Sequence, residues 1–76
     1  MSGKERRELE RKIEALVIAI PRETEANEYY LKLANEYEDP ASKEMFTFLA
    51  DQENRHRQSL EHILAGLEEQ LAKLPK

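Results

Sequence analysis

Three ionisable residues, Glu23, Glu53 and His56, interrupt the apolar pattern of a chain whose other charges fall at polar positions. Carboxylate oxygens and a neutral imidazole nitrogen form a ligand set that suits iron or manganese and accepts zinc. Glu53 and His56 stand at positions i and i+3, so on a helix both side chains project toward the same point. We therefore expect these three residues to be metal ligands and to act as catalytic residues.

Two long helices are the elements that must position these residues. Residues 4–37 and 40–73 are rich in Glu, Lys, Arg, Ala and Leu, which are good helix formers. Residues 38–42 predict a turn between them, and with only 2 Gly and 3 Pro a β-sheet is not expected. The fold class is therefore all-α, with residues 1–76 forming one antiparallel helical-hairpin domain.

Prolines mark the turn and one interior position. Asp39 is a suitable N-cap, and Pro40 follows at the first helical position, where its missing N–H costs nothing. Pro21 falls inside the first helix, where it removes a hydrogen bond. Because the apolar pattern keeps its phase on both sides of Pro21, we expect one continuous helix with a kink there.

The three ionisable residues fall at one level of this hairpin. At a rise of 1.5 Å per residue, Glu23 lies roughly 24 Å before the turn, and Glu53 and His56 lie roughly 21 and 25 Å after it. We expect all three to point into the core, where unpartnered charges are costly. The Glu-x-x-His spacing alone is a weak signal in a Glu-rich chain, so the shared level is the stronger one. The apolar stripes are expected to comprise Leu9, Ile13, Leu16, Ile20, Asn27, Tyr30, Ala34 and Tyr37, then Phe46, Leu49, Leu60, Ile63, Leu67, Leu71 and Leu74.

A second copy of the hairpin would complete both the core and the site. The apolar stripe is too wide for two helices to cover, which favours a homodimer forming a four-helix bundle. Two copies would supply four Glu and two His, the ligand set of di-iron carboxylate bundles. Four carboxylates also balance the charge of two divalent cations, so we expect two iron ions per dimer, with manganese or zinc as substitutes.

Composition excludes several other classes of protein. The 76 residues contain no Cys, which rules out disulfides, thiolate metal sites and Cys nucleophiles. The net charge of −4 argues against a nucleic-acid partner. No apolar run approaches the length of a membrane span and no signal-peptide pattern opens the chain, so we expect no membrane partner and a cytoplasmic location.

The motifs at these positions resemble the ferritin-like superfamily. They are the segment from Glu23 to Tyr30, the Asp39-Pro40 turn, and Glu53-Asn-Arg-His56. Over about residues 16–67 the chain is most similar to encapsulated ferritins, whose protomer is a two-helix hairpin and whose ferroxidase centre forms between two protomers. The interval from Glu23 to Glu53 fits that family better than the rubrerythrins, which it resembles more distantly.

The resemblance implies roles for several residues and partners. Glu23, Glu53 and His56 would be iron ligands, Tyr30 would join the catalytic set by hydrogen bonding near the centre, and Glu25 would guide metal entry. Tyr29 would stand beside the site as its aromatic neighbour, whereas Arg22 occupies a position where the family often has an acidic residue. The resemblance also implies a higher oligomer of dimers inside an encapsulin nanocompartment, although no cargo-targeting pattern is recognised in the sequence.

Three functions follow from these observations. The first is a ferroxidase that oxidises Fe²⁺ to Fe³⁺ for iron storage or detoxification. The second is a rubrerythrin-like peroxide reductase, which the lack of Cys disfavours because such enzymes usually draw electrons from a Cys-ligated iron domain. The third is a non-catalytic helical dimerisation module whose buried Glu–His layer only sets the register of the helices.

Overall fold

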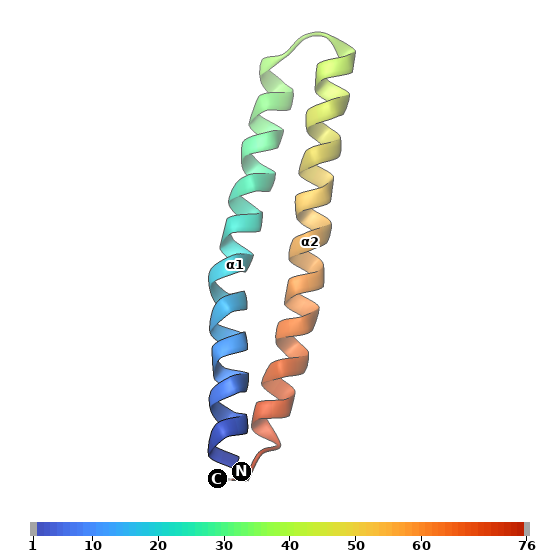
Figure 1. The fold of residues 1–76 in the computed structure, drawn as a ribbon. Helices are drawn as coiled ribbons and strands as arrows, with labels where there is room; N and C mark the ends of the chain where they lie inside the picture. The colour runs from blue at the N-terminus through green and yellow to red at the C-terminus, as the bar shows by residue number, and fades with distance from the viewer. Residues whose placement is uncertain (1, 76) are drawn as a thin grey trace.

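The computed structural model describes residues 2–75 and consists of two helices. Helix α1 spans Ser2–Glu36 and helix α2 spans Pro40–Ala72. The two helices lie side by side and antiparallel, so both ends of the chain meet at the same end of the molecule (Figure 1). The predicted all-α hairpin is confirmed, and the described residues contain no strand. Neither described helix has a segment long and apolar enough to cross a bilayer.

The turn is organised by a helix cap. Asp39 has extended backbone angles (φ −72°, ψ 136°), and its Oδ2 accepts a hydrogen bond of 2.9 Å from the Ser42 backbone N–H. Hydrogen bonds from the Ser42 side chain and backbone favour the ionised carboxylate, and they lower the pKa of Asp39. Pro40 begins α2. This cap reverses the chain and sets the level at which α2 starts.

Helix α1 runs without interruption through Pro21. Figure 1 draws it as one unbroken coil from the N-terminus to the turn. Proline cannot donate the usual helical hydrogen bond, and the exposed position of Pro21 lets solvent serve the carbonyl that loses its partner. Glu23 therefore lies on the same continuous helix as Leu9 and Ala34.

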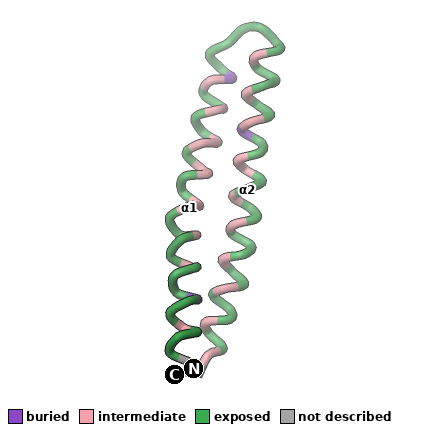
Figure 2. The backbone as a smooth tube through the Cα atoms, viewed as in Figure 1, coloured by how far each residue is buried: buried purple, intermediate pink, exposed green. Residues whose placement is uncertain are grey.

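The seam between the helices is narrow. In the part of the chain whose burial is described, the buried apolar residues are Leu9, Ala34 and Ala50, and Ala50 has no exposed surface at all. Figure 2 shows that exposed residues dominate both helices, with a row of half-buried residues along the seam. The molecule measures 58 × 15 × 12 Å and has a radius of gyration of 17.4 Å, whereas a compact chain of this length would have about 11 Å. A single hairpin thus leaves much of its apolar surface in water.

Among the described residues, eight large apolar side chains are exposed, and two of them were expected in the seam. Tyr37 is 42% exposed and Ile63 is 50% exposed, so their assignment to the hairpin core is wrong. Both lie where one side of the stripe faces outward, because two helices cover only part of a wide apolar face. The Tyr37 ring still stacks on Phe46 at 5.4 Å between centroids. The full set is Val17, Ile18, Tyr29, Leu31, Tyr37, Met45, Phe48 and Ile63.

Candidate metal centre

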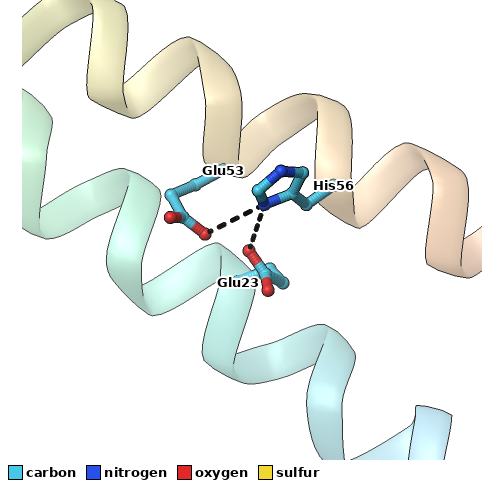
Figure 3. A group of neighbouring side chains, drawn as sticks. All are labelled: Glu23, Glu53 and His56. Carbon is cyan, nitrogen blue, oxygen red and sulfur yellow. Dashed lines mark ion pairs between the residues drawn. The ribbon is translucent and has the colours of Figure 1, made fainter.

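Glu23 on α1 meets Glu53 and His56 on α2 at the middle of the hairpin (Figure 3). Each residue offers one ligand atom, and these atoms all lie within 4.8 Å of one another. The Nδ1 atom of His56 is 3.6 Å from Oε2 of Glu23 and 3.8 Å from Oε2 of Glu53. The predicted common level of the three residues is therefore confirmed by distances between their side chains.

Their burial differs from the expectation that all three point into the core. The carboxylates of Glu23 and Glu53 are about three-quarters buried, but the His56 side chain is 61% exposed. At 100° per residue, His56 lies about 60° around α2 from Glu53 and so stands at the edge of the seam. Figure 3 shows the ring turned so that one nitrogen faces both carboxylates while the other points away from them. The cluster is therefore closed on one side and open on the side of His56.

The electrostatics of the cluster favour a bound cation. Protonated Glu23 can share a hydrogen bond with Glu53, and this bond, followed by burial and the negative charge of Glu53, raises the pKa of Glu23, whereas His56 opposes that rise. Oε2 of Glu23 is buried and has no hydrogen-bond partner among the described residues. Buried polar atoms normally have such a partner. An acceptor oxygen without one, beside a second carboxylate, is the environment that a divalent cation would satisfy.

Asn27 was expected in the seam, but its hydrogen bond and those of Arg57 were not predicted from the sequence. Asn27 donates a 2.7 Å hydrogen bond from Nδ2 to the main-chain oxygen of Ala50. Arg57 donates to Asn54 Oδ1 at 2.7 Å and to Glu61 Oε1 at 2.8 Å. The signal for Asn27 was a polar residue inside the apolar stripe of α1. The spacing gave no such signal for Arg57, because i,i+4 pairs with both Glu53 and Glu61 were open to it.

Tyr30, Glu25 and Arg22, to which the resemblance also drew attention, are not part of the cluster. The ring of Tyr30 packs between Tyr29, at 5.5 Å, and Phe46, at 6.5 Å between centroids. Within residues 2–75, no hydrogen bond joins the Tyr30 hydroxyl to the three candidate ligands. Glu25 and Arg22 are both exposed on α1. Roles for Tyr30 in the chemistry and for Glu25 in metal entry thus stay predictions.

A family model described as rubrerythrin matches residues 14–76 of this chain. The chain belongs to the rubrerythrin family. This family lies within the ferritin-like superfamily, and its members are di-iron oxidoreductases that bind iron. Comparison with curated proteins and with solved structures gives no match, so the assignment rests on the family model.

The residues of the cluster fit the iron of the rubrerythrin family. Two carboxylates and one imidazole are the donors expected for a carboxylate-rich iron site. The unpartnered Glu23 Oε2 is already directed into the cluster, and Nδ1 of His56 faces the same space. One hairpin nevertheless supplies only three such residues among those described, and it leaves the cluster open on one side.

Proposed function

We propose that this rubrerythrin-family chain is a ferroxidase whose Fe²⁺ substrate binds to Glu23, Glu53 and His56 from two hairpins. The observation that carries the proposal is the convergence of three ligand atoms within 4.8 Å, one of them a buried carboxylate oxygen with no hydrogen-bond partner. A merely structural Glu–His layer would be expected to satisfy that oxygen with a hydrogen bond.

The open side of the cluster supports a homodimer. Helical periodicity places Met45, His56 and Ile63 within about 20° of one another around α2, so the open side of the cluster continues into exposed apolar surface. An apolar groove of about 320 Å³ extends this surface. A second hairpin packed on this face would bury the apolar groove and the open side of the cluster. It would also bring its own three candidate ligands next to those of the first hairpin. Lys12, Ala15, Leu16, Ile63 and Leu67 line the groove.

The paired site has a ligand set suited to iron oxidation. Four carboxylates from two copies would balance the charge of two Fe²⁺ ions and stabilise the more highly charged Fe³⁺ product. In the overall reaction, two Fe²⁺ give up one electron each, and O₂ takes both electrons with two protons to form H₂O₂. As a ligand, the His56 imidazole would be neutral and would offer Nδ1 without adding charge, and the exposed part of its side chain would lie against the second copy.

We further propose that this protein functions in the same way as the encapsulated ferritins that its sequence resembles. A two-helix protomer with an incomplete site, as found here, is what that resemblance predicts. It extends the proposal to an oligomer of dimers inside an encapsulin shell, since a hairpin with a 58 Å long axis cannot itself enclose a mineral.

Peroxide reduction is the second candidate, because the family model that matches is that of rubrerythrin. The same two Fe²⁺ could reduce a peroxide, and the resulting Fe³⁺ would then need electrons for another turnover. These 76 residues contain no Cys to hold an electron-donating iron centre, so the electrons would have to come from a donor outside them. Repeated turnover with peroxide and an external reductant would favour this candidate over the ferroxidase.

Anaerobic titration with Fe²⁺ followed by addition of O₂ tests the proposed ferroxidase. Wild type should bind one Fe²⁺ per chain, form dimers in analytical ultracentrifugation, and oxidise the iron rapidly. Glu53→Ala and His56→Ala should lose binding and oxidation. His62→Ala is the matched control, because exposed His62 is on the same helix but outside the cluster. Absence of Fe²⁺ binding in wild type, or unchanged oxidation in Glu53→Ala, would contradict the proposal.

A further inference from the structure

The hydrogen bond from Asn27 to Ala50 joins the two helices next to the metal cluster. Its length is 2.7 Å between Asn27 Nδ2 and the Ala50 main-chain oxygen. Asn27 follows Glu23 by one helical turn on α1, and Ala50 precedes Glu53 by about one turn on α2. Because the helices are antiparallel, both steps lead toward the hairpin turn. The bond therefore forms the layer directly adjacent to the layer of candidate ligands.

The ligand layer itself tends to separate the helices. Glu23 and Glu53 carry like charges, and their carboxylate oxygens belong to a cluster whose ligand atoms all lie within 4.8 Å of one another, so they repel each other when no cation is bound. The apolar contacts above and below this level are non-directional and fix the axial position of one helix against the other only weakly. A hydrogen bond to a main-chain atom is directional and fixes that position. Asn27 supplies such a bond in the layer directly next to the one where the charges oppose contact.

Ala50 allows this bond to form. Its side chain is fully buried and small, so α1 can approach the backbone of α2 closely at this point. Close approach is needed because the Asn27 side chain is short and must reach the main chain of the other helix. Glu23, Asn27, Ala50 and Glu53 thus form two consecutive layers, one held by a hydrogen bond and one carrying the ligands.

We propose that Asn27 is a positioning residue for the metal site, holding Glu23 level with Glu53 and His56 before metal arrives. This inference rests on the proposed function, because it assigns Asn27 to the same site. Its role is distinct from ligation: Asn27 acts through the position of α1 and contributes no donor atom to the cluster. Without the bond, α1 and α2 would still pair through their apolar seam, but the three ligands would no longer share one level.

A second cross-helix hydrogen bond provides a matched control. Lys43 Nζ donates to the Ala34 main-chain oxygen at 3.1 Å, so it too joins a side chain of one helix to the backbone of the other. It lies near the hairpin turn, well away from the ligands. Lys43→Met removes this bond while keeping a long side chain. A general loss of cross-helix hydrogen bonding would affect Asn27 and Lys43 variants alike, whereas positioning of the site would affect only the Asn27 variants.

The test compares wild type, Asn27→Leu, Asn27→Gln and Lys43→Met. Leucine has nearly the shape of asparagine and keeps the seam packed, so helix content by circular dichroism should be retained. In the metal-free proteins, nuclear Overhauser contacts between Glu23 and Glu53 should weaken in Asn27→Leu and persist in Lys43→Met. Co²⁺, used as a spectroscopic probe, should bind Asn27→Leu about tenfold or more weakly than wild type, with a changed visible spectrum. Asn27→Gln, which keeps the amide donor, should recover part of the affinity.

Wild-type contacts and Co²⁺ affinity in Asn27→Leu would overturn the inference, and so would equal losses in Lys43→Met. Failure of the proposed function gives a different result: wild type itself would then bind neither Co²⁺ nor Fe²⁺. In that case the contacts in the metal-free proteins still decide whether Asn27 holds Glu23 level with Glu53.

Discussion

The Nδ1 atom of His56 on α2 lies 3.6 Å from Oε2 of Glu23 on α1. The two residues belong to the cluster with Glu53. Among the described residues, this is the only cluster of three possible metal ligands, and both helices contribute to it. The carboxylate is largely buried while the imidazole is largely exposed. The pair therefore links the hairpin seam to the face on which a second copy would lie.

Removal of the Glu23 charge should stabilise the metal-free protein while weakening metal binding. In Glu23→Gln the like-charge contact with Glu53 is lost, so the free energy of unfolding at neutral pH should rise by roughly 0.5 kcal/mol. Urea unfolding in the presence of a chelator measures this change, and anaerobic Fe²⁺ titration measures the loss of affinity. Glu28→Gln, on the exposed surface of the same helix and outside the cluster, should change neither quantity. A less stable metal-free Glu23→Gln would contradict the assigned repulsion.

The same contact gives the metal-free protein a defined pH dependence. Glu53 raises the pKa of Glu23 in the folded state above its ordinary value of 4.5. A raised folded-state pKa contributes stability that is fully present below the unfolded pKa and is lost as pH rises through the folded pKa. Wild type should therefore gain stability relative to Glu23→Gln as pH falls from neutrality toward 4.5. Urea unfolding of both proteins across this range measures the difference, and parallel curves would refute the prediction.

A positive charge introduced on the open side of the cluster should weaken the homodimer. Ile63 is 50% exposed and lines the apolar groove on the side of His56. In a twofold dimer each substitution acts twice, and burial of one such side chain contributes about 1.5 kcal/mol or more, so Ile63→Lys should weaken the dimer about a hundredfold. Fe²⁺ binding should fall with it, because each hairpin then keeps only half a site. Sedimentation velocity and Fe²⁺ titration measure the two effects.

Val17→Lys is the control for that substitution. Val17 is similarly exposed, at 54%, but lies about 120° around α1 from Glu23 and therefore away from the ligand side. The dimer affinity and the Fe²⁺ affinity of Val17→Lys should match those of wild type. Equal disruption by both substitutions would show that the second copy does not lie on the groove side.

Sequence patterns were sufficient to predict the two helices and the common level of the three candidate ligands. Helix-forming composition and the Asp39-Pro40 cap predict two antiparallel rods, and a constant rise per residue then places Glu23 opposite Glu53. The confirmed proximity of His56 to both carboxylates depends only on that register. These features are local or periodic, which is why a single sequence contains them.

The burial of individual residues and the hydrogen-bond partners of side chains were harder to predict from the sequence. Stripe membership did not reveal that His56 and Ile63 face outward, because a wide apolar stripe does not show which part meets the neighbouring helix. The choice of Arg57 between Glu53 and Glu61 also depends on the rotamer and on Asn54, whose amide oxygen accepts from the same guanidinium. Such choices are set by three-dimensional competition between partners at equal sequence spacing.

Asp39 should stabilise the hairpin in a manner that depends on its charge. Asp39→Ala removes the acceptor for the Ser42 N–H and should lower the melting temperature at neutral pH, whereas Asp39→Ser keeps a capping oxygen and should retain most of the stability. The lowered pKa of Asp39 means that its contribution is present above the unfolded pKa and is lost as pH falls through the folded pKa. Thermal unfolding followed by circular dichroism should therefore show wild type and Asp39→Ala converging in acid. A constant difference at every pH would mean that the carboxylate charge has no part in the cap.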